Sequence, residues 1–136
     1  MKITNSILVL LFGAMATHAQ LAVTVSPPKI VWQKAVVPLA MKNNFGEKIE
    51  SARAAVFLLD ERGKMIGQAT KWVIGGSQDK PGLAAGATNA FHFVIATEKP
   101  FTTTNLTAKV PFSRVVLEGG RLGDVAKDVV VTVTGK

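Results

Sequence analysis

Apolar and polar residues alternate with a period of two along most of the chain after residue 20, as in LAVTVS at 21–26 and TNAFHFVIA at 88–96. Such alternation is typical of β-strands that bury one face, and no convincing helical spacing competes with it. The pattern predicts about seven strands, at residues 21–26, 30–43, 49–60, 65–74, 88–96, 106–118 and 128–135.

Three of these segments carry features that complicate a simple strand. Pro38 cannot donate a backbone hydrogen bond, so its part of 30–43 is expected at a sheet edge or beside a bulge. In 106–118 the apolar positions change phase near Ser113 and Arg114, which predicts a β-bulge. The alanine-rich segment 49–60 could also be read as a helix, because alanine has the highest helix propensity.

The segments between the predicted strands contain turn-forming residues. Residues 60–63 (DERG) are expected to form a hairpin turn, in which Asp60 bonds to the turn backbone and Gly63 takes the left-handed conformation. Residues 75–87 are expected to form a long loop. Strands do not alternate with helices, so the pattern favours one antiparallel β-sandwich domain spanning residues 20–136.

The first residues have the three parts of a secretory signal. Lys2 supplies a basic start, residues 7–14 form an apolar run, and Thr17 and Ala19 place small side chains before a cleavage site. This run is far shorter than the roughly 20 residues that cross a bilayer, and no later stretch is long enough. We therefore expect residues 1–19 to be a signal peptide cleaved near Ala19. The remaining chain is expected to be periplasmic or extracellular and not an integral membrane protein.

Composition narrows the range of chemistry and of partners. The absence of cysteine excludes disulfides, thiolate nucleophiles and zinc–thiolate sites. The formal net charge is +7, and loss of Lys2 with the signal leaves +6, which favours anionic partners such as lipopolysaccharide or acidic polysaccharide. Basic residues nevertheless alternate with acids, as in EKIESAR, and aromatic residues are not interleaved with them. We therefore expect no nucleic-acid binding and interpret most of the charge as a solvated surface.

Two stretches, VFLLDERGKMIGQATKWVIGG and GLAAGATNAFHFVI, are similar to exported bacterial immunoglobulin-like domains related to the FxLYD family. In those domains a strand ending in Leu-Tyr-Asp or a variant turns through a glycine into the next strand, and an L-x-x-G-x-T-x-x-F-x-F segment follows. The residues that fit are Leu58, Asp60, Gly63, Gly86, Thr88, Phe91 and Phe93, while Val56 and Leu59 replace the motif's Phe and Tyr. The resemblance implies an immunoglobulin-like sandwich that serves as a non-enzymatic interaction domain, and it supplies no functional residues.

Candidate catalytic groups are few. His92 is the one histidine after residue 19, so the predicted mature chain cannot form a two-histidine metal site. A serine nucleophile would need His92 as its base, yet no serine lies in a G-x-S-x-G motif and His92 is expected on the outward face of its strand. Asp60 and Glu61 are adjacent and therefore point apart. The glycine-rich segment 75–87 lacks the G-K-[ST] ending of a phosphate-binding loop. We expect no catalytic residue, no metal site and no cofactor.

Apolar side chains on the predicted surface are the remaining candidates for a site. Trp32 is a candidate surface anchor, since aromatic residues concentrate in interfaces. Phe57 and Leu59 lie opposite the predicted core face of their strand, where either loops cover them or they form a patch that meets a partner. Trp72 lies in phase with Ile66 and Ile74 and is expected to pack in the core.

Three functions remain, in decreasing order of support. The first is a non-enzymatic interaction or structural module of the cell envelope, whose partner is an envelope or extracellular protein of unknown identity. The second is a binding module for an anionic polymer, such as a polysaccharide or lipopolysaccharide, through a basic surface. The third is a hydrolase that uses His92 as its base.

Overall fold

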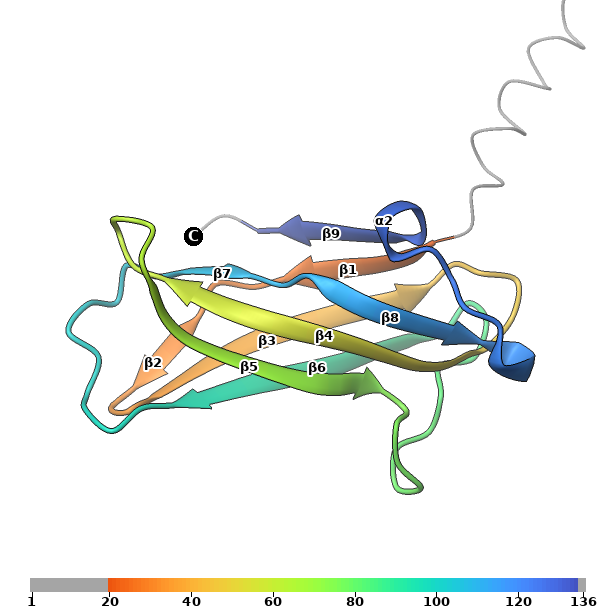
Figure 1. The fold of residues 1–136 in the computed structure, drawn as a ribbon, viewed down its shortest axis with the longest axis horizontal. Coiled ribbons are helices and arrows are strands. Elements are labelled where there is room, and N and C mark those ends of the chain that lie inside the picture. Colours follow the sequence, from red (N-terminus) through yellow and green to blue (C-terminus); the bar gives the residue numbers. More distant parts are fainter. Residues whose placement is uncertain (1–19, 135–136) are drawn as a thin grey trace, which may run out of the picture.

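The structure is a computed structural model that describes residues 20–134, and most of these residues lie in β-strands (Figure 1). The strands are β1 (Leu21–Val25), β2 (Lys29–Val31), β3 (Lys34–Asn43), β4 (Ile49–Leu59), β5 (Met65–Ile74), β6 (Thr88–Ala96), β7 (Thr107–Lys109), β8 (Phe112–Leu117) and β9 (Val129–Val133). A 3₁₀-helix, η1 (Glu118–Gly120), and a single turn of helix, α2 (Val125–Asp128), precede β9. The predicted signal peptide, residues 1–19, lies outside the described residues.

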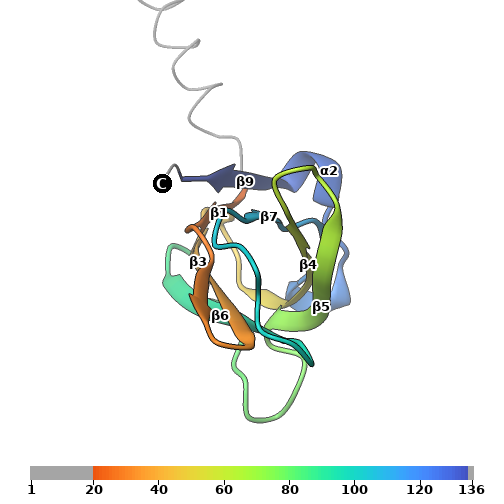
Figure 2. The same cartoon turned by 90° about the vertical axis from the view of Figure 1, so that its left-hand side faces the viewer.

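The strands form two sheets that face each other across the interior (Figure 2). In the first, sheet A, β3 pairs with β6 on one side and with β2 and β1 in succession on the other, and β9 continues the sheet beyond β1. In the second, sheet B, β4 pairs with β5 on one side and with β7 and β8 on the other. All pairs are antiparallel except β1 with β9, which are parallel. The predicted all-β, antiparallel sandwich is confirmed, and segment 49–60 is a strand rather than a helix.

The sandwich has nine strands rather than the expected seven, because two predicted segments are each divided. Segment 30–43 reverses direction at Trp32 and Gln33, which form a tight turn between β2 and β3. Segment 106–118 is divided between β7 and β8 at Val110 and Pro111, where proline has no N–H to donate to a ladder.

The prediction that Pro38 lies at a sheet edge or beside a bulge is wrong, because β3 is an interior strand of sheet A. Pro38 instead lies where the neighbour of β3 changes from β1 to β2. The carbonyl of Pro38 accepts a hydrogen bond from Ser26 N at 3.0 Å on that side. The N–H and C=O of a strand residue point to the same side, so the missing donor faces the interruption between β1 and β2.

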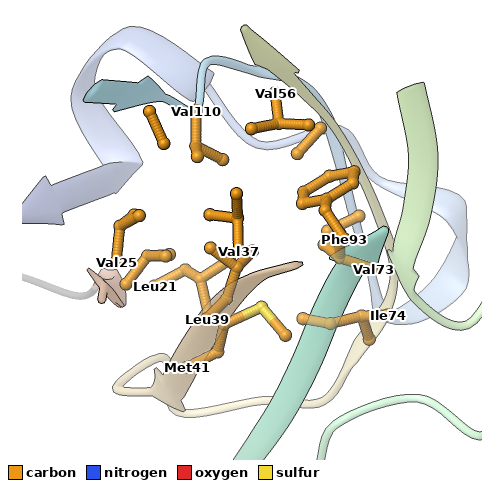
Figure 3. Close-up of a cluster of buried hydrophobic side chains, with 14 of the residues drawn as sticks. Leu21, Val25, Val37, Leu39, Met41, Val56, Val73, Ile74, Phe93 and Val110 are labelled. Carbon is orange, nitrogen blue, oxygen red and sulfur yellow. The ribbon is translucent and has the colours of Figure 1, made fainter. Parts of the chain in front are cut away.

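The core lies between the sheets and includes alternate side chains of β3, β4 and β6, together with the adjacent Val73 and Ile74 of β5 (Figure 3). Val37, Leu39 and Met41 of β3 are buried, as their spacing predicts, and Phe93 of β6 is the largest fully buried side chain. Full burial of a Val, Leu, Ile, Phe or Met side chain contributes about 1.5–3 kcal/mol, so this interior is the main stabilising element of a chain without disulfides.

Asn43, at the end of β3, is the one buried polar residue among those described, with no exposed surface. Its Nδ2 donates to the carbonyls of Glu47 and Leu83, each at 2.9 Å, and its Oδ1 accepts from Phe45 N at 2.8 Å. Its backbone N–H and C=O bond to residues 86–87 as well. The side chain therefore joins the turn after β3 to the long loop between β5 and β6.

We expect Asn43→Ala to lower the free energy of unfolding by at least about 2 kcal/mol, because it leaves buried donors and acceptors without partners. The measurement is urea denaturation of a chain that comprises residues 20–136. Asn44→Ala is the matched control, since its side chain is exposed and only its backbone N–H is used. Equal effects of the two substitutions would contradict the structural role of the Asn43 side chain.

Candidate functional site

Trp32 lies at the tip of the β2–β3 hairpin, at one end of the sandwich (Figure 1). Its side chain is 72% exposed, the largest exposure among the big apolar residues described. Its backbone φ is +57°, and it is the one non-glycine residue of the described chain with a positive φ. Positive φ at the first central position of a two-residue hairpin belongs to the type II′ turn, where glycine is the usual residue.

This conformation opposes the intrinsic preference of tryptophan. A bulky side chain at positive φ is a rare outlier, and such strain costs on the order of 1–3 kcal/mol. Strain of this kind persists where the surroundings impose it, and it concentrates at functional sites. Trp32 therefore combines local strain with a large apolar surface left in water.

The loop between β6 and β7, residues 97–106, holds the tip from the other side. The carbonyl of Trp32 accepts from Phe101 N at 3.4 Å, and the carbonyl of Gln33 accepts from Thr97 N at 2.9 Å. The side-chain Nε2 of Gln33 donates to the carbonyl of Glu98. These hydrogen bonds anchor the backbone of the turn to the 97–106 loop. The exposed Trp32 side chain therefore projects from an anchored turn.

Phe57 and Leu59 lie on the outer face of β4, in sheet B, and both are half-buried. Phe57 pairs with Gln68 of β5 and with Lys109 of β7. The structure does not bring these two residues together with Trp32, because Trp32 belongs to a turn of sheet A and the outer face of sheet B points away from that sheet. The three candidate residues thus occupy two separate surfaces.

Trp72 does not pack in phase with Ile74, contrary to expectation. The β4–β5 register changes between the pairs Ala52–Ile74 and Arg53–Trp72, so Val73 is an extra residue and is buried together with Ile74. Trp72 consequently lies on the outer face, half-buried, with the Arg53 guanidinium carbon 5.7 Å from its ring centroid. A bulge reverses the phase here.

A second arginine lies beside this pair. Arg114 of β8 is directly opposite Arg53 across the strands, and a change of register beside them leaves Ser113 without a partner. The bulge predicted near Ser113 and Arg114 is confirmed. The phase change in the sequence predicted the bulge. It did not predict that Arg114 would lie opposite Arg53, because that depends on the pairing of β4 with β8.

The charges of DERG belong to a hairpin turn, as predicted. Oδ1 of Asp60 accepts from the backbone N–H groups of Arg62 and Lys64, each at 2.9 Å, and Gly63 has a φ of +81°. The backbone hydrogen bond from Lys64 contributes most to lowering the pKa of the Asp60 carboxyl below 3.8. The bond from Arg62 and the positive charges of both residues lower it further, whereas partial desolvation acts in the opposite direction.

His92 lies exposed on the outer face of β6, opposite Pro38 of β3. Among residues 20–134, no group of three or more histidine, aspartate and glutamate side chains could hold a metal ion. The same residues contain no helix with the length and apolar character needed to span a bilayer.

The acidic residues of the described chain lie almost entirely outside the strands, whereas basic residues lie both in strands and in turns and loops. Seven lysines and arginines lie within the nine described strands, whereas Glu50 is the one acidic residue there. The outer face of sheet A carries three of these cations, Lys29, Lys34 and Lys42, and no strand of that sheet contains an acid. Acidic and basic residues alternate along the chain, but nearly all the acids fall in turns and loops. The strands of sheet A therefore carry positive charges only.

Comparison with known proteins supports the fold alone. No protein-family model and no curated protein matches the chain. The crystal structure of a candidate ApaA protein from Bordetella pertussis matches 77% of this chain and 85% of its own, with a TM-score of 0.53 and 18% identity. IrmA from Escherichia coli matches 82% of this chain and 92% of its own, with a TM-score of 0.48 and 12% identity. The chain thus has the sandwich fold seen in the Bordetella protein, and its relation to FxLYD domains stays a prediction.

The Asp60 turn predicts an acid-sensitive contribution to stability. Because the pKa of Asp60 is lower in the folded chain than its ordinary value of 3.8, the carboxylate stabilises the fold above that value. The contribution is lost as pH falls through the folded pKa. The measurement is the urea denaturation midpoint between about pH 2 and 7. We expect Asp60→Asn, which keeps an acceptor oxygen but has no charge, to lose the fall in this midpoint at acid pH that Asp60 causes.

The control for this measurement is Glu61→Gln, since Glu61 is exposed in the same turn. It should preserve the acid dependence of the unmodified chain. An Asp60→Asn profile that matches the unmodified chain at every pH would refute the assignment.

Proposed function

We propose that residues 20–136 form a non-enzymatic binding module of the cell envelope or the extracellular space, which recognises an envelope or extracellular protein through Trp32. The observation that carries this proposal is an exposed tryptophan held in a backbone conformation that favours glycine. Export rests on the signal-like segment at residues 1–19.

Energetics support a binding role for this residue. A glycine at position 32 would relieve the backbone strain and remove an exposed apolar surface, so stability alone favours its replacement. Tryptophan is among the residues that most often dominate the binding energy of protein interfaces. A side chain on a fixed turn also loses little conformational freedom when it binds, which preserves affinity. Phe57 and Leu59 are candidates for a second contact on the outer face of sheet B.

Substitutions at Trp32 should therefore separate stability from binding. We expect Trp32→Gly to be more stable than Trp32→Ala by about 1 kcal/mol, because only glycine accepts the positive φ without strain. Both variants should lose the indole contact and bind the partner at least about tenfold more weakly. Urea denaturation measures the first effect, and quantitative capture of the partner from envelope extract measures the second.

The control is Val94→Ala, which shortens an apolar side chain that is 52% exposed on β6, opposite Val36 and outside the hairpin turn itself. It should capture the same partner as the unmodified chain. Capture that survives in both Trp32 variants, or that is lost equally in Val94→Ala, would remove Trp32 as the anchor.

A second function, binding of an anionic polymer, is supported by a different observation. Lys29, Lys34 and Lys42 share the outer face of sheet A, and the strands of that sheet carry no carboxylate to neutralise them. Lys29 and Lys34 lie close together, and Lys42 lies eight residues further along β3. Charges of one sign without acids between them raise the positive potential of the face, which attracts polyanions and weakens with salt.

Heparin, a convenient polyanion, tests this second function. We expect the triple substitution of Lys29, Lys34 and Lys42 by Gln to elute from a heparin column at clearly lower salt than the unmodified chain. The same substitution of Lys48, Lys64 and Lys99, which lie in turns and loops, changes the net charge equally and should have a smaller effect. Equal effects would indicate that net charge, and not this face, determines retention.

A further inference from the structure

Three side chains form a row across neighbouring strands on the outer face of sheet B. Trp72 of β5, Arg53 of β4 and Arg114 of β8 occupy paired positions, and the three strands lie side by side (Figure 1). Together with Ser113 they line a pocket of about 330 Å³. Both arginine side chains are exposed to solvent, so a ligand can reach them.

Two irregularities of strand pairing converge on Arg53. On the β5 side the register changes between Ala52 and Arg53, and on the β8 side it changes between Arg53 and Ala54. Each change places an outward side chain beside Arg53: Trp72 in the first case and Arg114 in the second. Bulges of this kind redirect side chains and are enriched next to binding sites.

The second bulge determines the direction of Arg114. Phe112 pairs with the buried Ala54 and packs against the core, so strict alternation would turn Ser113 outward and Arg114 inward. Ser113 is the extra residue, and its hydroxyl donates to the carbonyl of Arg53 at 3.4 Å. With Ser113 unpaired, Arg114 points outward and Val115 takes the buried position.

The two guanidinium groups have the same charge, and neither is paired with an acid of the described chain. Like charges directly opposite each other on adjacent strands are destabilising. Within residues 20–134 neither arginine forms an ion pair with a carboxylate. The fold therefore maintains a repulsive pair where a bound anion would neutralise both members.

Trp72 orients Arg53 within this row. The Arg53 guanidinium lies over the indole, within the range of a cation–π interaction. Gly76 packs against the same indole, since a Cβ at Gly76 would lie 2.4 Å from Trp72 Cγ. The indole of Trp72 therefore packs against Gly76 and stacks with the Arg53 guanidinium.

We propose that Arg53, Arg114 and Trp72 form a binding site for a tetrahedral dianion, which is either inorganic phosphate or sulfate or a phosphate monoester of a larger molecule. A guanidinium presents a planar fork of donors that bonds two oxygens at once. A carboxylate has two oxygens and a single charge, so one fork satisfies it. Inorganic phosphate, inorganic sulfate or a phosphate monoester supplies enough oxygens for forks from two strands, and its double charge balances two arginines.

This inference deepens the second proposed function by assigning a discrete site to the sheet opposite the lysine face. It does not depend on Trp32. The two surfaces are tested by different variants, so failure of one is distinguishable from failure of the other. If the chain binds heparin but not phosphate, the arginine site is overturned and the second function stands. If it binds neither, both the site and the second function are overturned.

The test is a titration of the mature chain with inorganic phosphate at constant ionic strength, with chloride as the balancing ion. Trp72 fluorescence in a Trp32→Phe background reports occupancy, and the shift in Tm provides an independent readout. We expect saturable binding. Arg114→Lys and Arg53→Lys keep the charge but lose the fork, so each should raise the apparent Kd about tenfold, equivalent to about 1.4 kcal/mol.

Lys109→Gln is the control, because Lys109 shares the outer face of sheet B and pairs with Phe57, away from the arginine row. Its apparent Kd should stay within about twofold of the parent value. Absence of saturable binding in the parent, or an unchanged Kd in both arginine variants, overturns the site.

Stability without ligand provides a further test that does not require binding. In low-salt, phosphate-free buffer, Arg114→Gln removes the repulsion and should raise Tm by about 1–4 °C. A fall in Tm would mean that Arg114 stabilises the fold, and would overturn the proposal. Glucose 1-phosphate then distinguishes the source of the anion: a lower Kd than for inorganic phosphate supports a phosphorylated saccharide, and an equal Kd supports the free anion.

Discussion

Successive side chains of a β-strand point to opposite faces, and each of the two sheets has to bury one of those faces against the other. This requirement organises the molecule, because a chain without cysteine depends on burial for most of its stability. The longest strand of each sheet, β3 in sheet A and β4 in sheet B, is an interior strand and alternates between buried and accessible residues along nearly its whole length. Asn43 is the polar exception, and its hydrogen bonds close the interior at the end of β3.

The candidate sites lie where this regular alternation is interrupted. Bulges at Val73 and Ser113 bring Trp72 and Arg114 to the outer face on either side of Arg53. In the tight turn at Trp32 the indole is exposed to solvent, and the backbone has a positive φ that tryptophan disfavours. An uninterrupted strand would offer none of these features. Departures from the pattern therefore have a local cost in pairing or strain, and they produce the surface features that a partner could recognise.

The same requirement explains the distribution of charge. A charged side chain on an inner face would lose its hydration without a partner, so strand cations such as Lys34 and Arg53 lie on accessible positions. Most acids lie in the turns, where Asp60 shows their use: its carboxylate accepts two backbone hydrogen bonds and stabilises a hairpin. Two cationic faces result, one on each sheet, although the chain reads as a mixture of both signs.

Features that depend on local chemistry are predictable from the amino-acid sequence. Alternation identified the strands and the buried set of Val37, Leu39 and Met41; turn chemistry identified the role of Gly63, and a phase change located the bulge at Ser113. Tertiary structure alone decided which strands are neighbours: the parallel pairing of β1 with β9 joins the two ends of the domain, and Arg53 meets Arg114 only through the pairing of β4 with β8. It also imposed the turn at Trp32, whose residue types favour no reversal. The physical reason is that side-chain alternation is a property of each strand, whereas pairing and burial depend on contacts between residues far apart in the chain.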